Sequence, residues 1–176
     1  MRIETDRLVL LRTSGDILRA DLEGSAALAD ALGIAVSPEW PPSSEYDGDA
    51  IRYMIALLDR EPAAYDWGFR YIVRKAPAPT VIGAGGYTGP AKDGSIEIGY
   101  SICPSERRRG FASEATQALV DNAFEHSDVA RVIAHTLPDL TSSIGVLKNC
   151  GFKLVGAGAE EGTVRYAIER GDWRGS

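Results

Sequence analysis

The stretch IEIGYSICPSERRRGFA, residues 96–112, decides how the centre of this chain folds. Its first part alternates between apolar residues such as Ile96 and Ile98 and small or polar residues such as Glu97. A period of two is typical of a β-strand with one buried face, so we expect a strand over Ser95–Cys103. Pro104 then ends the strand, because proline has no N–H to offer to a neighbouring strand.

A basic loop, Ser105–Gly110, joins this strand to a helix that we expect over Phe111–His126. The N–H groups at a helix start have no partner inside the helix, and the helix dipole adds positive charge there. Gly110 and Ala112 leave the backbone open to an anion, and the three arginines before Gly110 supply charge for phosphate oxygens. The sequence therefore predicts a pyrophosphate site here, with a solvated basic loop as the alternative.

Short strands and helices make up the rest of the chain. Three consecutive strands with short turns predict an antiparallel meander that ends in Ser95–Cys103, and a helical crossover predicts that Arg131–Thr136 lies parallel to it. We expect one domain over residues 1–176, in the α/β (α+β) class, with a mixed, mostly antiparallel sheet of about seven strands flanked by helices. The other expected strands are Leu8–Arg12, Trp67–Arg74, Val81–Thr88, Phe152–Gly156 and Thr163–Ile168, and the other expected helices are Ile17–Glu23, Ala26–Leu32, Asp49–Arg60 and Thr141–Cys150.

The overall composition excludes several classes of protein. The 176 residues are 44% hydrophobic and carry a formal net charge of −6, whereas duplex-binding proteins usually need a basic face, so we expect no nucleic-acid partner. No apolar run approaches the ~20 residues of a membrane span, so we expect no membrane partner. Cys103 and Cys150 are too few for a disulfide framework and have no His or Cys at metal-ligand spacing. We therefore expect a reduced, cytoplasmic protein without a metal.

The pattern Arg107-x-x-Gly110-x-Ala112 matches the Gln/Arg-x-x-Gly-x-Gly/Ala signature of the GNAT superfamily of N-acetyltransferases. Its wider context resembles the RimJ/RimL-like subgroup, which includes the ribosomal-protein N-acetyltransferases. The resemblance extends over about Ile3 to Glu169. It is carried by ETDRL at 4–8, GGYTGP at 85–90, IEIGY at 96–100, GFASEA at 110–115, and residues 139–152.

This resemblance implies a GNAT fold that binds acetyl-CoA. Strands 4 and 5 of the expected sheet, Ser95–Cys103 and Arg131–Thr136, should splay apart at their C-terminal ends. Backbone groups freed in this way would hold the pantetheine arm and the thioester, while the loop and helix start would hold the pyrophosphate. The cofactor-binding residues implied are Tyr100, Ser101, Ile102, Arg107, Arg108, Arg109, Gly110, Phe111, Ala112 and Ser113.

Acetyl transfer to an amine needs a proton acceptor, because an alkyl amine with a pKa of about 10 is protonated at pH 7. Glu97 is our candidate base, since its face of the strand also carries Gly99 and Ser101; a solvated carboxylate or an arginine partner is the alternative. Ser143, retained from the family pattern, is our candidate for holding or protonating the sulfur, with helix capping as its alternative. We assign no catalytic role to the two histidines, and we interpret Cys150 as a buried structural residue.

The acceptor side is the least determined by the sequence. Trp40, Tyr65, Trp67 and Tyr87 are candidates for an acceptor pocket, with a packing aromatic as the alternative for each. From the resemblance we expect the acceptor to be a primary amine of a small molecule or a protein N-terminus, acetylated by direct attack in a ternary complex; a homodimer is left open. Leu140 replaces the asparagine usual in relatives, which leaves as the alternative a catalytically weak or inactive acyl-CoA-binding or interaction module on the same fold.

Two local features of the sequence complete the expectations. Thr141 or Ser142 should cap the last helix, and Gly151 should end it in a left-handed conformation. The glycines at Gly83 and Gly85 do not make a dinucleotide-binding fingerprint, because Thr88 takes the third glycine position and a turn follows instead of a helix.

Overall fold

The computed structural model describes residues 2–44, 46–61 and 65–175. Nine strands in these ranges form one sheet in the order β1-β2-β4-β5-β6-β7-β9-β8, with β3 paired to β5. The strands are β1 Ile3–Glu4, β2 Leu8–Arg12, β3 Ala35–Val36, β4 Phe69–Arg74, β5 Thr80–Tyr87, β6 Ser95–Ile102, β7 Arg131–Thr136, β8 Lys153–Ala157 and β9 Val164–Glu169. The helices are α1 Gly15–Glu23, α2 Ser25–Leu32, α3 Gly48–Arg60, α4 Phe111–Phe124 and α5 Thr141–Asn149.

The predicted fold class is confirmed: the sheet is mixed and mostly antiparallel, with helices packed against it. There are somewhat more strands than the seven expected. The two additional strands, β1 and β3, have only two residues each and so carry no periodicity that a sequence could show. Among the described residues, no helix is long and apolar enough to cross a membrane.

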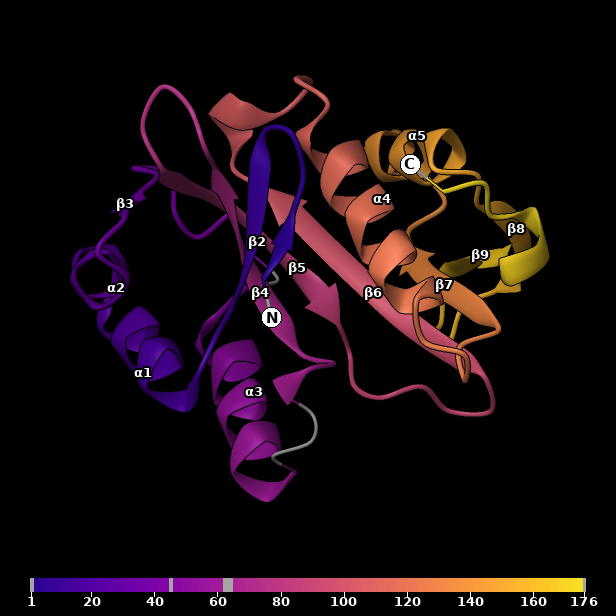
Figure 1. Ribbon diagram of the computed structural model, residues 1–176, viewed down its shortest axis with the longest axis horizontal. Helices are drawn as coiled ribbons and strands as arrows, with labels where there is room; N and C mark the ends of the chain where they lie inside the picture. Colours follow the sequence, from indigo (N-terminus) through magenta and orange to yellow (C-terminus); the bar gives the residue numbers. More distant parts are fainter. Residues whose placement is uncertain (1, 45, 62–64, 176) are drawn as a thin grey trace.

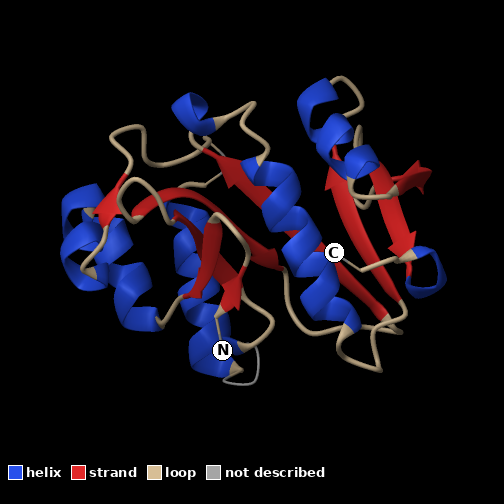
Figure 2. Cartoon of the chain, turned by 45° about the horizontal axis from the view of Figure 1, so that its top comes forward, coloured by secondary structure: helices blue, strands red, loops and turns tan. Residues whose placement is uncertain are grey.

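Two clusters of apolar side chains lie on opposite faces of the sheet. Alternate residues of one strand divide between them: Ile72 packs with α4, and Tyr71 and Val73 pack with the N-terminal helices. Figure 1 shows α1–α3 gathered around the N-terminal half of the sheet and α4 and α5 over the C-terminal half. In Figure 2, α4 is the long central helix that lies along β6.

The strands β6 and β7 separate partway along their length. They pair in parallel over three positions only, Ser95–Glu97 against Arg131–Ile133. Beyond Glu97, β6 continues to Ile102 with β5 as its one partner strand in the described chain, while β7 continues beside β9. The predicted splay between these two strands is thus present.

The last helix departs from its expected cap. Leu140, and not Thr141 or Ser142, occupies the N-cap position of α5, and no side chain caps this helix. A leucine side chain has no oxygen that could accept from the N–H groups of the first turn, and the Thr141 N–H donates to the Asp139 carbonyl at 2.8 Å instead. Gly151 does follow α5 with a φ of 84°, as predicted.

Candidate active site

The start of α4 presents a row of backbone N–H groups. Gly110 is the N-cap residue, with φ 84° and ψ 0°, and no side chain caps the helix. The first backbone bond that Gly110 accepts comes from Glu114, with its N 3.0 Å from the Gly110 O. In the described chain, the N–H groups of Phe111, Ala112 and Ser113 are therefore without a partner. Such a turn can bind an anion through its backbone and dipole.

The three arginines of the loop have different partners. Arg107 is used internally, because its Nε donates to the Ile102 carbonyl at 2.7 Å and its Nη2 donates to the Pro42 carbonyl at 3.0 Å. Arg109 pairs with Glu106. Arg108 lies at φ 60° and is exposed, and no described residue bonds to its side chain. Arg108 is thus the arginine of the three that is available to a phosphate.

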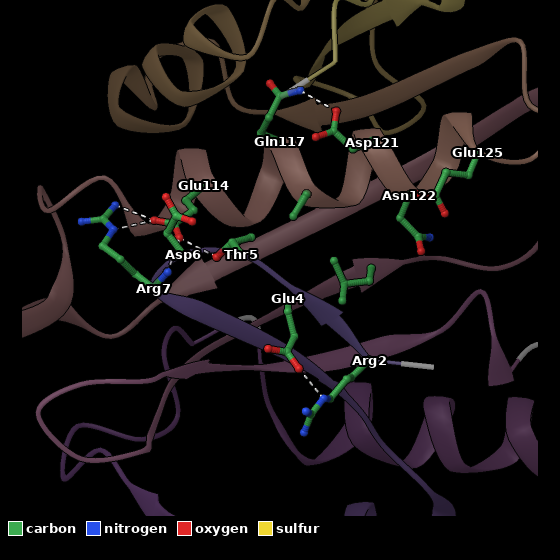
Figure 3. Close-up of a pocket in the computed structure, with 12 residues that line it drawn as sticks. Arg2, Glu4, Thr5, Asp6, Arg7, Glu114, Gln117, Asp121, Asn122 and Glu125 are labelled. Carbon is green, nitrogen blue, oxygen red and sulfur yellow. Dashed lines mark hydrogen bonds and ion pairs between the residues drawn. The ribbon is translucent and has the colours of Figure 1, made fainter.

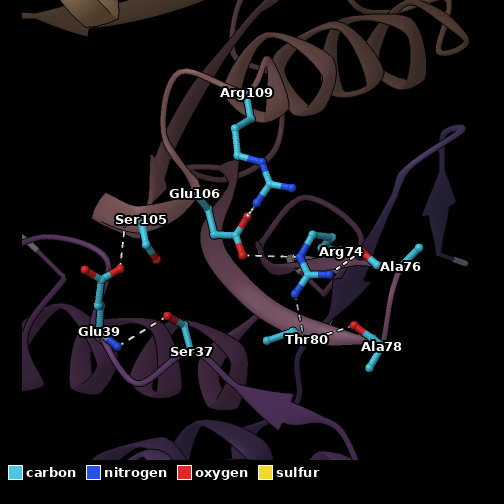
Figure 4. Close-up of polar contacts among 9 residues, drawn as sticks. All are labelled: Ser37, Glu39, Arg74, Ala76, Ala78, Thr80, Ser105, Glu106 and Arg109. Carbon is cyan, nitrogen blue, oxygen red and sulfur yellow. Dashed lines mark hydrogen bonds and ion pairs between the residues drawn. The ribbon is translucent and has the colours of Figure 1, made fainter.

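Acidic residues beneath the loop fix its shape (Figure 4). Glu106, in the 3₁₀ turn Pro104–Glu106, accepts from Arg74 Nε at 3.3 Å and also from Arg109. Glu39 accepts a hydrogen bond from the Ser105 N–H at 2.7 Å, and hydrogen bonding from the Ser105 side chain and from this N–H lowers the pKa of the Glu39 carboxyl. The basic loop is therefore held by one carboxylate of its own, Glu106, and by Glu39 from the N-terminal part of the chain.

An N-terminal clamp also holds the start of α4. Glu114, in the first turn, accepts hydrogen bonds from the Thr5 hydroxyl and from the backbone N–H of Arg7. The Arg7 guanidinium pairs with the same carboxylate and donates to the Arg109 carbonyl at 3.0 Å. These contacts give the ETDRL stretch, residues 4–8, a structural role. Sequence reasoning gave it none, because the contacts join residues more than 100 positions apart.

Figure 3 shows this clamp at one end of a polar hollow of about 890 Å³ between β1 and the outer side of α4. Five carboxylates line the hollow. They are Glu4, Asp6, Glu114, Asp121 and Glu125. Arg2 and Arg7 also line the hollow, but each is paired with one of these carboxylates, so the hollow as a whole is acidic and does not favour an anion.

A bridge of side chains crosses the splay. The Tyr100 hydroxyl on β6 lies 3.4 Å from the Ser143 Oγ on α5 and 3.3 Å from the Ser143 carbonyl oxygen. Burial raises the pKa of Tyr100 to about 12, so the phenol is protonated at neutral pH and can donate a proton or a hydrogen bond. Two residues predicted for the site thus meet, one from each side of the gap.

The open edge of β6 follows from its pairing with β5. The bonds from Thr88 N to Glu97 O and from Cys103 N to Ile82 O set which residues face β5. In an antiparallel ladder the intervening residues, including Tyr100, direct their backbone groups to the other side. That side faces the splay, where pantetheine amides would find free partners.

The carboxylate of Glu97 lies at the vertex of the splay, 3.0 Å from His135 Nδ1 (Oε1 to Nδ1) on β7. Its side chain is 34% exposed and that of His135 is 16% exposed. Glu97 thus has a hydrogen-bond partner that the sequence did not reveal, because the pair joins two strands separated by a helix.

An apolar cavity of about 460 Å³ lies on the sheet face that α3 covers. Its floor is formed by small residues of β5 and β6, among them Ala84, Gly86, Gly99 and Ser101. Its walls come largely from α3 and the segments that flank it. They include Tyr46, Tyr53, Met54, Leu58, Tyr65 and Phe69. No charged side chain is among its described lining residues.

The predicted acceptor aromatics lie around this cavity in different ways. Trp40 does not line it: its indole Nε1 donates to the buried Asp21 at 2.8 Å, and its ring packs on the wall residue Tyr46. Trp67 does not line it either: it packs edge-to-face against Tyr87, with a centroid distance of 5.1 Å, and packs with the apolar cluster on the α4 face. Trp40 therefore supports a wall of the cavity from behind, whereas Trp67 belongs to the other face of the sheet.

Tyr87 lines the cavity, but its hydroxyl points to α4 and donates to the Leu119 carbonyl at 2.6 Å. Of the wall aromatics, Tyr65 was among the sequence candidates, whereas Tyr53 was missed by sequence reasoning. The signal was the apolar stripe of the helix Asp49–Arg60, which we interpreted as core spacing only.

Neither cysteine is positioned as a nucleophile. Cys103 and Cys150 are buried, and burial raises the pKa of both thiols, that of Cys150 to about 11. A thiol that stays protonated at neutral pH is a poor nucleophile. In the ranges that the structure describes, no cluster of His, Cys, Asp and Glu could hold a metal ion.

Comparison with known proteins gives a consistent result. The Acetyltransferase (GNAT) domain family matches residues 18–153. The chain is 31% identical over 158 residues to the uncharacterized N-acetyltransferase YjdG of Bacillus subtilis, covering 90% of this chain and 93% of that one.

Among solved structures, RimL, a ribosomal L7/L12 α-N-protein acetyltransferase in complex with coenzyme A, has a TM-score of 0.64 at 20% identity, covering 96% and 98% of the two chains. The ribosomal-protein-S5-alanine acetyltransferase of Vibrio fischeri has a TM-score of 0.68 at 16% identity, covering 99% of each. At these identities the two structures show a shared fold.

Proposed function

The chain belongs to the GNAT family of acetyltransferases, and from that premise we propose that it transfers the acetyl group of acetyl-CoA to a primary amine bound in the apolar cavity, by direct attack in a ternary complex. One observation carries the proposal: β6 borders both the splay and the cavity. Its backbone edge faces the gap toward β7, while Gly99 and Ser101 form part of the cavity floor. A thioester held in the gap would therefore lie within reach of an amine in the cavity.

The residues at the start of α4 suit a diphosphate. The N–H groups of Phe111, Ala112 and Ser113 would bind its oxygens, and the unpaired guanidinium of Arg108 would add charge. Arg107 and Arg109 would act by shaping the loop, given their internal partners. The open edge of β6 around Tyr100 would bind the pantetheine arm.

Acetyl-CoA supplies the reactive carbonyl when it is bound, and the protein has to move protons. Glu97 would accept the proton of the ammonium group, directly or through water, so that the amine becomes a nucleophile. A coenzyme A thiolate, with a pKa near 8.5 by analogy with cysteine, needs only modest stabilisation as it leaves. The protonated Tyr100 hydroxyl and the adjacent Ser143 would donate hydrogen bonds to it across the splay, which their contact supports.

The cavity favours an acceptor whose amine is its one charged group. The described lining offers aromatic and aliphatic surface from residues such as Tyr53, Met54 and Phe69, and no carboxylate or guanidinium. Burying an unpaired second charge there would be costly, whereas burying an aromatic or alkyl group is favourable. We therefore infer an arylalkyl or alkyl monoamine as the substrate class, rather than a polyamine or a free amino acid.

The experiment is a thiol-release assay with acetyl-CoA and four amines: phenylethylamine, hexylamine, spermidine and a peptide with a free N-terminus. The proposal expects the first two to have the highest kcat/KM. Preference for the peptide would indicate a protein N-terminus as acceptor, and preference for spermidine would contradict the substrate class. If calorimetry shows coenzyme A binding but no amine is turned over, the result would instead support the non-catalytic module. The structural argument for that alternative is the exposed Leu140, which leaves the start of α5 without a side-chain cap.

A further inference from the structure

His135 lies at the splay vertex, where β6 and β7 begin to separate, and it has no assigned role. Glu97 is the last residue of β6 that pairs with β7, opposite Ile133. His135 lies two residues beyond Ile133, where the strands have begun to part, and its Nδ1 is 3.0 Å from Glu97 Oε1. This side-chain bond therefore continues the contact between β6 and β7 just where the backbone ladder ends.

The pair lies on the cavity side of the sheet. Val132 and Ala134 of β7 are buried in the cluster that packs under α4, so the alternating His135 faces the other way. Glu97 shares its face of β6 with Gly99 and Ser101, which form the cavity floor. The Glu97 carboxylate and the His135 imidazole thus lie on the same face of the sheet as Gly99 and Ser101, which form the floor of the cavity proposed for the acceptor.

Neither apolar packing nor a full set of hydrogen bonds explains why the His135 side chain is buried. Its Nε2 is buried and has no hydrogen-bond partner in the described chain. A buried polar atom without a partner is destabilising, and valine or isoleucine would fill a strand position without that cost. The charged groups facing the ring are Glu97 on β6 and, across the ladder on β9, the exposed Arg165. Within the part of the chain that the structure describes, the ring makes one hydrogen bond, which is the bond to the candidate base.

We propose that His135 is the positioning residue for Glu97, an inference that rests on the proposed function. A carboxylate can only accept, so the neutral imidazole carries its proton on Nδ1 and donates it to Glu97. The bond fixes the rotamer of a glutamate that is otherwise one-third exposed, and it holds the carboxylate across the vertex toward the acceptor amine. Nε2 remains without a proton.

Nuclear magnetic resonance tests the bond without any turnover. The chain has only two histidines, so the ring ¹⁵N signals of His135 are assignable against those of His126. At pH 8 the proposal expects the Nδ1–H tautomer for His135 in the wild type and the Nε2–H tautomer in Glu97→Ala. An Nε2–H ring in the wild type, or a tautomer that Glu97→Ala leaves unchanged, would overturn it, whether or not the protein proves to be an acetyltransferase.

Kinetics test the positioning role with an isosteric pair. The amide nitrogen of asparagine mimics Nδ1, whereas that of glutamine mimics Nε2. His135→Asn should keep most of the wild-type kcat, while His135→Gln and His135→Leu should lose about 10-fold or more, as expected for a charge-assisted hydrogen bond, with an unchanged KM for acetyl-CoA.

A double-mutant cycle measures whether His135 acts through Glu97 or independently of it. Because His135 acts through Glu97, the double variant Glu97→Gln/His135→Leu should be no slower than Glu97→Gln alone. Losses that multiply, or a His135→Asn variant as slow as His135→Leu, would show that the ring acts independently of the carboxylate. Coenzyme A affinity and the melting temperature establish that each variant is folded.

Discussion

The guanidinium of Arg7 closes on the carboxylate of Glu114, with Arg7 Nε 2.7 Å from Glu114 Oε2 and Arg7 Nη2 2.6 Å from the same oxygen (Figure 3). The same guanidinium donates to the Arg109 carbonyl and lies 3.2 Å from the point where a Cβ on Gly110 would stand. A segment from the extreme N-terminal part of the chain thus holds both the first turn of α4 and the loop before it.

Replacing Arg7 should therefore weaken cofactor binding without touching the cofactor site directly. Arg7→Leu removes charge-assisted bonds worth about 1.5 kcal/mol, so we expect the Kd for coenzyme A in calorimetry to rise about 10-fold as the loop loses its order. Arg2→Leu is the matched control, because Arg2 pairs with Glu4 on the exposed N-terminal strand and not with the loop. Equal effects of the two substitutions would contradict a specific role for the clamp.

Glu114 should also make the stability of the protein depend on pH. Burial alone would raise the pKa of its carboxyl, but the bonds from Thr5 and Arg7 outweigh burial and lower it. A carboxyl with a lowered folded pKa stabilises the protein fully above its unfolded value of about 4.3, and this contribution is lost as the pH falls through the folded pKa.

Urea unfolding of the wild type and of Glu114→Gln between pH 7 and pH 3 measures this contribution. We expect the wild type to be the more stable at pH 7 and the difference to shrink as the solution becomes acidic. A difference that stays constant over this range would mean that the Glu114 charge does not stabilise the fold.

The sequence was sufficient for features that depend on local pattern. The alternation of β6 and the glycine before α4 are properties of neighbouring residues, so both the strand and the uncapped helix start could be expected from about twenty positions. The sequence did not predict the backbone conformation of Gly110, which is φ 84° in the structure, although glycine adopts a positive φ without a steric penalty.

Features that join distant segments were beyond the sequence. The Glu97–His135 bond and the Arg7–Glu114 clamp each connect residues on different elements, 38 and 107 positions apart. The same holds for Trp40, which the sequence placed at the acceptor: it has a buried hydrogen-bond partner, Asp21, that only the packing of α1 reveals. A side chain's type restricts what it can bind but does not say which partner the fold will bring to it.

Gly110→Asp tests the phosphate site itself. A carboxylate at this position would lie beside the diphosphate, and two unit charges about 4 Å apart repel by about 4 kcal/mol at an effective dielectric constant of 20, so we expect at least a 100-fold loss of coenzyme A affinity.

Gly110→Asn is the control for the charge in that substitution. Asparagine has nearly the same size as aspartate and tolerates positive φ, and both substitutions would meet the Arg7 Nη2 at the same 3.2 Å from the Cβ. Affinity should therefore fall much less in Gly110→Asn. If the two variants bind coenzyme A equally, repulsion of a phosphate at this turn is excluded.

The uncapped start of α5 offers a gain in stability. Leu140 is 46% exposed at the N-cap, so Leu140→Asn adds a side-chain acceptor and gives up little packing. N-cap substitutions of this kind are worth about 1 kcal/mol, which corresponds to a rise in melting temperature of about 2–4 °C. Leu137→Asn, at 45% exposure and outside the helix, is the control and should give no rise in calorimetric scans.

Gly99 lies on the floor of the cavity that we propose for the acceptor, on the strand whose edge faces the proposed cofactor site. A Cβ built on Gly99 meets no atom within 4 Å, so Gly99→Val places its side chain in the open space above the cavity floor without straining β6. We expect the KM for the amine to rise about 10-fold or more, since the acceptor loses space, while the affinity for coenzyme A stays within about 2-fold of the wild type.

Gly99→Ala, which adds a single methyl group, should fall between the wild type and Gly99→Val in the KM for the amine. A graded rise would follow from progressive filling of the cavity beside Glu97. If Gly99→Val instead weakens coenzyme A binding and leaves the amine KM unchanged, the cavity does not hold the acceptor, because the added bulk would then be interfering on the cofactor side of β6.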